Sequence, residues 1–328
     1  MKAQRGAAIL TAMLTVVLVA SLASATLWQQ WRGVEVEAAQ RTRTQSAWIL
    51  SGALDWARLI LREDGRKGGA DHLAEPWAVP LESARLSSFL AADRSDALLA
   101  DASQEAFLSG QITDLQSRLN VTNLVQGGKV DATSELAFTR LFELLDLPET
   151  ELILMLDKLR LAQPAAAGAP GGAPVAPVTE LEAASAALWP QTLDQLAWLG
   201  LSPRSIAVLR PFVTILPVRT PVNLNTAPAE VIYACVEGFD LADAHRLVQA
   251  RNATHLATLN DAAKISGKTS VQFNATLHSV SSRFFEVRGT LRIEQATVQE
   301  LSVVQRDGLE VKTLMRQRAV ASAMPTLQ

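Results

Sequence analysis

The sequence has very little cysteine and no large excess of charge of either sign. Cys235 is the only cysteine in 328 residues, so the chain can form no internal disulfide and has no second thiol for a zinc or redox site. The 30 basic and 33 acidic residues leave a net charge of −3, and no overall field draws the chain to nucleic acid or anionic lipid. We therefore predict that Cys235 is a buried apolar residue and that partners are recognised locally.

Motifs for catalysis are also missing. The four histidines, His72, His245, His255 and His278, are dispersed, and none forms a paired ligand motif with a nearby carboxylate. There is no Gly-x-Ser-x-Gly elbow and no dinucleotide-binding fingerprint. The sequence predicts that the protein is not an enzyme.

A long apolar run near the N-terminus is the strongest positive feature. From Ala7 to Leu27 the chain has 21 residues without a charge, which is enough for a helix to cross the hydrocarbon core of a bilayer. The six residues before it, 1–6, include Lys2 and Arg5, and these cations should stay on the cytoplasmic side. We predict a transmembrane segment at 7–27 and export of everything that follows.

The boundary of this run resembles a prepilin-type leader, with Lys2-Ala3-Gln4-Arg5-Gly6 followed by Ala7-Ala8-Ile9-Leu10-Thr11. The resemblance implies that a prepilin peptidase cuts after Gly6, where the missing side chain lets the backbone approach the protease, and that Ala7 becomes N-methylated. Most pilins carry glutamate at mature position five, whereas this chain has Thr11, and lack of the glutamate is typical of K-type pseudopilins. An ordinary secretory signal cleaved near Ala25 is the alternative.

Apolar residues recur at helical spacing beyond the predicted span, with Ile49, Ala53, Trp56, Ala57 and Ile60 on one face. One helix from Ala7 to Arg62 would be roughly 80 Å long. Its second half should pack on a sheet outside the membrane. We expect Gly65, Gly68 and Gly69 to end it.

Two further stretches, 71–78 and 110–124, resemble the same family. The second predicts a strand that leads into a capped helix, at the point where K-type subunits insert a helical domain. Residues 135–161 are helix-rich with a break at Leu147-Pro148. Residues 163–178 are mostly Ala, Pro and Gly, which predicts a linker.

Residues 222–232 predict the start of a helix-hairpin-helix, with Thr226 as its N-cap. This motif also occurs in proteins that bind DNA phosphates through glycine-rich hairpins, so a membrane-tethered DNA-binding protein is a rival interpretation. Here the hairpin is Glu237-Gly238-Phe239-Asp240, and its two carboxylates lie where phosphate would bind. The sequence favours a structural use and no nucleic-acid partner.

The C-terminal region alternates apolar and polar residues. This pattern predicts strands at 285–293, 298–304 and 309–314, with a hairpin turn at Asp307-Gly308. We predict an α+β fold in which a long helix packs on a small antiparallel sheet, with an inserted helix-hairpin-helix or SAM-like domain. The expected parts are a leader at 1–6, a span at 7–27, pilin-like segments at 28–124 and 280–328, and the insert at 125–279.

Taken together, the leader and the later stretches resemble the minor pseudopilins of the K type from type II secretion systems. The resemblance implies a subunit at the pseudopilus tip that initiates assembly with I- and J-type minor pseudopilins. Its further partners would be the major pseudopilin, the prepilin peptidase and the inner-membrane secretion platform. It would cross the inner membrane once, with its C-terminal domain in the periplasm. A minor pilin of a type IV pilus is another alternative.

The resemblance also raises the question of calcium. Many K-type relatives carry an aspartate-rich calcium loop near the position of the Ala/Pro/Gly tract, and this chain has no such spacing. We expect no cofactor, with calcium left open.

Overall fold

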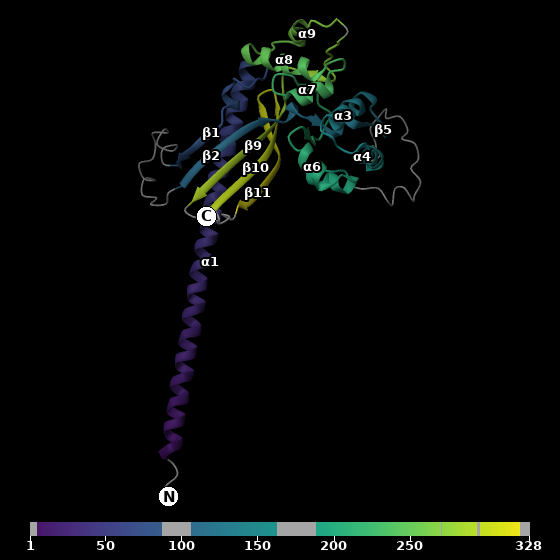
Figure 1. The fold of residues 1–328 in the computed structure, drawn as a ribbon. Coiled ribbons are helices and arrows are strands. Elements are labelled where there is room, and N and C mark those ends of the chain that lie inside the picture. Colours follow the sequence, from purple (N-terminus) through teal and green to yellow (C-terminus); the bar gives the residue numbers. More distant parts are fainter. Residues whose placement is uncertain (1–4, 87–105, 163–187, 270, 294–295, 322–328) are drawn as a thin grey trace, which may run out of the picture. The chain divides into compact units, whose positions relative to one another are not determined.

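The computed structural model describes residues 5–86, 106–162, 188–269, 271–293 and 296–321. It divides into two compact units, residues 1–53 and 54–328. The predicted α+β class is confirmed, because one long helix, a five-stranded antiparallel sheet and a group of shorter helices make up the described chain (Figure 1).

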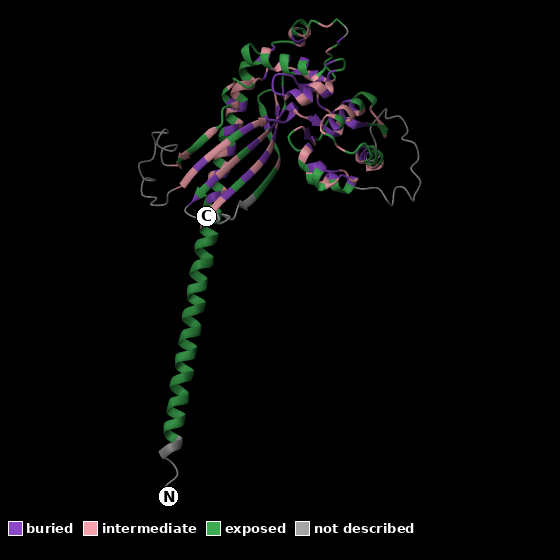
Figure 2. Ribbon diagram, in the orientation of Figure 1, coloured by how far each residue is buried: buried purple, intermediate pink, exposed green. Residues whose placement is uncertain are grey.

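The first unit is helical throughout its described part and belongs to helix α1, which runs from Arg5 to Lys67. Large apolar residues are exposed along it, as the green colour in Figure 2 shows; Ile9 and Leu10 are 63% and 70% exposed. The most apolar 18-residue window has a mean hydropathy of 2.2, and none of it is buried. Hydroxyls of Thr15 and Ser24 donate to backbone carbonyls of α1 itself, which satisfies them in an apolar medium. The helix is long and apolar enough to cross a membrane.

The end of α1 differs from the prediction. The helix continues through Gly65 to Lys67 and stops before Gly68, which has φ +67°. The prediction was therefore wrong for Gly65 and is confirmed for Gly68. A Cβ at Gly65 would lie 2.7 Å from the carbonyl oxygen of Gly308. Gly65 therefore permits close approach of the helix to a strand turn, which is a different use of a missing side chain.

The sheet has the strand order β1-β2-β9-β10-β11, and all neighbours are antiparallel. Strands β9, β10 and β11 confirm the three predicted strands, but the turn between β10 and β11 lies at Gly308 and Leu309 and not at Asp307-Gly308 as predicted. The short edge strand β1 was not predicted. The bounds are β1 Leu81–Arg85, β2 Ala106–Asp114, β9 Phe284–Ile293, β10 Ala296–Asp307 and β11 Glu310–Ala321.

The second unit buries the end of α1 against this sheet. Leu54, Ala57 and Leu61 share an apolar core with residues of β2, β9, β10 and β11, among them Phe285. Full burial of a leucine or phenylalanine side chain contributes roughly 1.5–3 kcal/mol, so this contact is a major source of stability. The guanidinium of Arg58 adds two hydrogen bonds to the carbonyl oxygen of Val311, at 3.0 and 2.7 Å.

Strands β2 and β9 are adjacent in the sheet but far apart in the sequence. Their register runs from Ala106 opposite Ile293 to Asp114 opposite Phe285. All the shorter α-helices of the described chain lie between these strands in the sequence, and Figure 1 shows them beyond the end of the sheet where β2 stops. They are α3 Ala132–Leu144, α4 Glu149–Ala162, α6 Pro203–Leu209, α7 Ala229–Cys235, α8 Leu241–Ala253 and α9 Leu259–Ser266.

Helices α3 and α4 confirm the predicted helical stretch and its break. The helix expected after β2 was wrong: the chain forms only the short 3₁₀ turns η3 Leu115–Ser117 and η4 Val121–Leu124. Asp114 and Asn120 each accept a hydrogen bond from a backbone N–H two residues ahead, and this local pairing competes with α-helix formation.

The remaining elements are short. A further 3₁₀ helix, η1, covers Pro76–Ala78, and η5 covers Leu193–Leu199. Three two-stranded sheets pair β3 Leu119–Asn120 with β6 Val213–Thr214, β4 Val125–Gln126 with β5 Lys129–Val130, and β7 Val222–Asn223 with β8 His278–Ser279.

The helical part has a separate apolar core, to which α3, α4, α6, α7 and α8 all contribute. Side-chain caps define where several helices begin; Asp131 accepts from the N–H of Ser134 at 3.0 Å, and Asp240 accepts from the N–H of Asp243 at 2.7 Å. Cys235 is only partly buried against this core, although burial raises the pKa of its thiol to about 12. The predicted linker at 163–178 and residues 1–4 lie outside the described residues.

Candidate functional site

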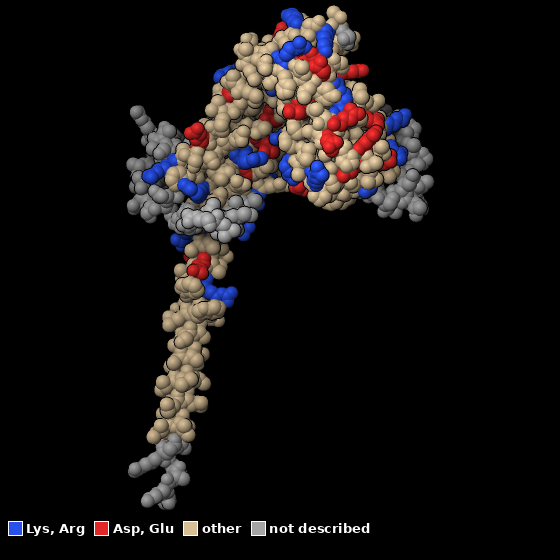
Figure 3. Space-filling model, viewed as in Figure 1, with Lys and Arg blue, Asp and Glu red and all other residues tan. Residues whose placement is uncertain are grey.

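The predicted processing site lies at the start of α1. Gly6 and Ala7 have helical backbone, and Thr11 donates its hydroxyl to the carbonyl oxygen of Ala8 at 3.0 Å. Figure 3 shows the described N-terminal stretch of α1 free of charged side chains on its visible face. Cleavage after Gly6, methylation of Ala7 and the role of Thr11 stay predictions.

The structure brings the three other stretches singled out in the sequence, 71–78, 110–124 and 222–232, to one place. They meet where the sheet ends and the helical part begins. We call the buried residues at this meeting point the polar joint; they are Asp71, Asp114, Asn223, Thr226 and Ser282, and none is more than 8% exposed.

Asp114, the last residue of β2, is the centre of the polar joint. One carboxylate oxygen accepts from the hydroxyl of Thr226 at 2.5 Å, the hydroxyl of Ser282 at 2.6 Å and the amide of Asn223 at 3.1 Å. The other accepts from the N–H of Gln116 at 2.7 Å. Burial raises the pKa of Asp114 to about 6, because desolvation of the carboxylate outweighs these hydrogen bonds. The carboxylate thus joins a sheet strand to two distant segments.

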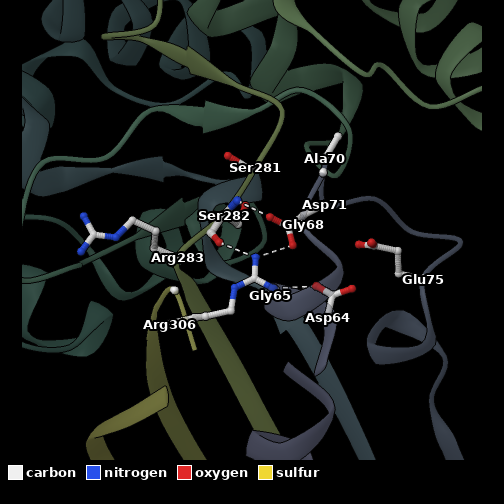
Figure 4. A pocket seen from close by; sticks show the side chains of 12 residues that line it. Asp64, Gly65, Gly68, Ala70, Asp71, Glu75, Ser281, Ser282, Arg283 and Arg306 are labelled. Carbon is white, nitrogen blue, oxygen red and sulfur yellow. Dashed lines mark hydrogen bonds and ion pairs between the residues drawn. The ribbon is translucent and has the colours of Figure 1, made fainter. Parts of the chain in front are cut away.

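Asn223 and Asp71 extend the network towards α1. The Asn223 amide also donates to the carbonyl oxygen of Asp71 at 3.1 Å and to the hydroxyl of Ser282 at 2.9 Å. Arg306 of β10 donates to carboxylate oxygens of Asp71 at 2.5 Å and of Asp64 at 2.6 Å (Figure 4). Helix α1, the sheet and the helical part are therefore linked by one set of buried hydrogen bonds and ion pairs.

A second set of side chains holds the segment before β7. Asn120 accepts from the N–H of Leu216 at 3.1 Å and donates to the carbonyl oxygen of Val218 at 2.9 Å. Asn123 donates to the carbonyl oxygen of Thr220 at 2.8 Å and accepts from its N–H at 3.0 Å. The polar residues of 110–124 thus act as positioning groups for the helical part.

Three carboxylates beside the polar joint lie close enough together to hold a metal ion. Asp64, Asp71 and Glu75 each have a potential ligand atom within 4.8 Å of the others. They line a cavity of about 220 Å³, shown in Figure 4, but Arg306 pairs with two of the three. The cluster is organised around this guanidinium, and a cation would have to compete with it.

Glu75 is the most perturbed member of this cluster. One of its oxygens accepts from the N–H of His72 at 2.9 Å and from the indole N–H of Trp77 at 2.7 Å. Burial, with a smaller contribution from the nearby Asp64 carboxylate, raises the pKa of Glu75 to about 7. A carboxyl group whose pKa is raised by folding stabilises the protein at low pH, and this contribution disappears as pH rises through about 7.

We expect Glu75→Gln to be more stable than the parent chain at pH 8 and no more stable at pH 5. Both donors bind the same oxygen, so the glutamine carbonyl can accept them without ionising. The gain at pH 8 should be about 1 kcal/mol after allowance for solvent screening, or roughly 2–4 °C in melting temperature. Thermal unfolding of the full chain in detergent at both pH values measures it. Glu143→Gln, an exposed change on α3, is the control, and a pH-independent effect of Glu75→Gln would contradict the assignment.

The predicted helix-hairpin-helix is present as α7 and α8, with one correction. Thr226 is not the N-cap of α7; Pro228 holds that position, and the Thr226 hydroxyl donates to Asp114 instead. Arg140 of α3 donates to the carbonyl oxygens of Val236 at 2.7 Å and Phe239 at 2.6 Å, which fixes the hairpin to the helical part. Glu237, Gly238 and Asp240 of the hairpin are exposed. This use of the hairpin supports the structural interpretation over a phosphate-binding one.

The four histidines are dispersed in the sequence, but the structure brings two of them together. His72 and His255 stack with ring centroids 4.0 Å apart. Sequence reasoning also missed the polar joint as a unit. The available signal was a set of small polar residues within apolar flanks, such as Ile-Thr-Asp-Leu at 112–115 and Val-Asn-Leu at 222–224.

Comparison with known proteins gives a consistent assignment. Two family models, both described as type II secretion system protein K, match residues 117–218 and 222–281. A type II secretion system protein K from Pseudomonas aeruginosa is 27% identical over 326 residues, covering 96% of this chain and 90% of the relative.

A solved structure, that of the GspK-GspI-GspJ complex of the type 2 secretion system of enterotoxigenic Escherichia coli, has the same fold. The match has a TM-score of 0.63 and 18% sequence identity, and covers 86% of this chain and 98% of the matched chain. Both family models lie within the helical part between β2 and β9 or next to it. The chain also has the apolar N-terminal helix α1. The chain therefore resembles the type II secretion system proteins K, the K-type minor pseudopilins, in two family models, in the sequence of one relative over nearly its whole length, and in fold.

Proposed function

We propose that this protein occupies the tip of the type II secretion pseudopilus, where it initiates and caps assembly and takes no catalytic part. The observation that carries the proposal is the position of the helical part, which leaves the sheet at Asp114 and returns to it at Phe284. Pilin-type helices pack side by side in a filament. A bulky addition on the head would collide with the next subunit above, and the tip is the one position without such a subunit.

We infer that α1 anchors the chain in the inner membrane before assembly, with the remainder in the periplasm. Its uncovered apolar surface supports this, because lipid or neighbouring pilin helices can cover it. The partners we propose are the I- and J-type minor pseudopilins, since the solved relative is described in complex with GspI and GspJ. The major pseudopilin, the prepilin peptidase and the inner-membrane secretion platform are further proposed partners.

A variant without the helical part, called the headless variant, tests the tip position. Asp114 and Phe285 are paired neighbours in antiparallel strands, so an Asn-Gly turn can replace residues 115–284 and close β2 and β9 into a hairpin. We expect this variant to insert into the membrane through α1 but to lose capping. Pseudopili should become longer and less uniform, and export of secreted proteins should fall at least tenfold.

Two controls accompany this experiment. Protease resistance of the remaining sheet shows whether the headless variant folds. Gln249→Glu, an exposed change on α8, should leave pilus length and secretion unchanged. A folded headless variant with normal pilus length and normal secretion would rule out the tip role.

A further inference from the structure

A second cavity, of about 410 Å³, lies beside the polar joint. It is lined by the segment after α1, Asn225 before α7, the C-terminal end of α8 and the loop that follows α8. Its described lining includes one arginine and two histidines and contains no aspartate or glutamate. The cavity at Arg306 is different, because there Asp64 and Asp71 form ion pairs with the guanidinium.

Arg251 is the one buried charged residue in the described lining of the second cavity. Only 7% of it is exposed, and one terminal nitrogen donates to the carbonyl oxygen of Leu224. Its Nε atom is buried without a hydrogen-bond partner among the described residues, and no described carboxylate forms an ion pair with the guanidinium. Burial lowers the pKa of Arg251 to about 10, with no counter-charge to offset it. A buried cation in this state gains strongly from a bound anion.

The histidine pair adds further donors to the lining. The rings of His72 and His255 stack with an interplanar angle of 12°. Nδ1 of His72 accepts from the N–H of Ala74 at 3.3 Å, so a neutral His72 carries its proton on Nε2 and can donate it. His255 and Asn252 are exposed residues of the lining, and neither the imidazole nor the amide has a hydrogen-bond partner among the described residues, so both are free to bind a ligand.

We propose that this cavity binds an oxyanion, either a carboxylate or a phosphate group. Arg251 would supply the positive charge, and His72, His255 and Asn252 would supply hydrogen bonds. The site joins the segment after α1 to the helical part, so a bound anion would link them beside the polar joint. This inference does not depend on the tip position.

Histidine resonances provide a direct test, because the chain has only four histidines. The full chain, labelled at histidine and held in non-ionic detergent at pH 7.5, is titrated with sodium phosphate and separately with sodium acetate, with sodium chloride keeping the ionic strength constant. We expect saturable shifts of the His72 and His255 signals, while those of His245 and His278 stay in place. Saturation with both salts indicates a general carboxylate and phosphate site, and saturation with one identifies the preferred group.

Asn252→Asp is the sharpest variant, because it places a carboxylate in the lining with almost no change of shape. We expect it to weaken anion binding at least tenfold. Gln249→Glu makes the same change of charge on α8 but outside the cavity lining, and it should bind as the parent does. Arg251→Gln should abolish the saturable shifts, provided that circular dichroism shows a folded chain.

Three results would overturn the proposal. The first is shifts in the parent chain that do not saturate, or that affect all four histidines equally. The second is equal weakening by Asn252→Asp and Gln249→Glu, which would point to long-range charge alone. The third is unchanged binding by a folded Arg251→Gln.

Discussion

Replacing Gly6 with valine is expected to abolish removal of the leader, so that the chain stays in the membrane as a precursor beginning at Met1. The branched side chain would obstruct the approach of the backbone to the peptidase, whereas glycine leaves it open. Because assembly would require a free mature N-terminus, secretion should fall to the level of cells without the protein. Intact-mass measurement of the purified chain, produced with and without prepilin peptidase, gives the result directly.

The parent chain in the same measurement should begin at Ala7 and carry one additional methyl group. Gly33→Ala is the matched control, because an added Cβ there meets nothing within 4 Å, and its processing should be normal. A mature chain that begins near residue 26, or cleavage that does not need the peptidase, would instead indicate an ordinary secretory signal.

Asp114→Ala is expected to be the most destabilising single substitution in the polar joint. It removes the carboxylate that accepts from the hydroxyls of Thr226 and Ser282 and from the N–H of Gln116. It also removes one of the three acceptors of the Asn223 amide. An unsatisfied buried donor costs about 1–3 kcal/mol, and with partial relaxation we expect a total loss of about 3–5 kcal/mol. The melting temperature of the full chain in detergent should fall by roughly 5–10 °C.

The exposed Asp157 of α4 provides the control, and Asp157→Ala should change stability by less than about 0.5 kcal/mol. Limited proteolysis adds a second readout, because loss of the polar joint should expose the chain near 115 and 283 before it exposes the interior of either core. Equal melting temperatures for the two variants would show that Asp114 does not hold the helical part on the sheet.

Short sequence patterns were enough to predict the local secondary structure of this protein. The charge-free run at 7–27 predicted an apolar helix by length and composition alone, and α1 contains it. The alternation in 285–293 predicted β9, because a period of two is visible over a few residues. The break at Leu147-Pro148 separated α3 from α4, since proline cannot continue a helix.

The errors occurred where distant segments compete with local preference. Thr226 has the side chain of a good N-cap, but a hydrogen bond to Asp114, 112 positions away, takes its hydroxyl. Glycine often ends a helix, but Gly65 lies inside α1. Its missing Cβ allows the carbonyl oxygen of Gly308 to approach the helix closely. Neither partner is visible within a sequence window of ordinary length.

By itself, the sequence determined the apolar helix, the alternating C-terminal strands, the helical character of the middle region and the resemblance to K-type pseudopilins, because each depends on neighbouring residues or on a motif. Only the tertiary structure decided that β2 pairs with β9 and that Asp71, Asp114, Asn223 and Ser282 form one buried network. It also placed Arg251 beside His72 and His255 without a carboxylate. The physical reason is that burial and charge pairing depend on which surfaces meet in space, and in this chain they meet across more than a hundred residues.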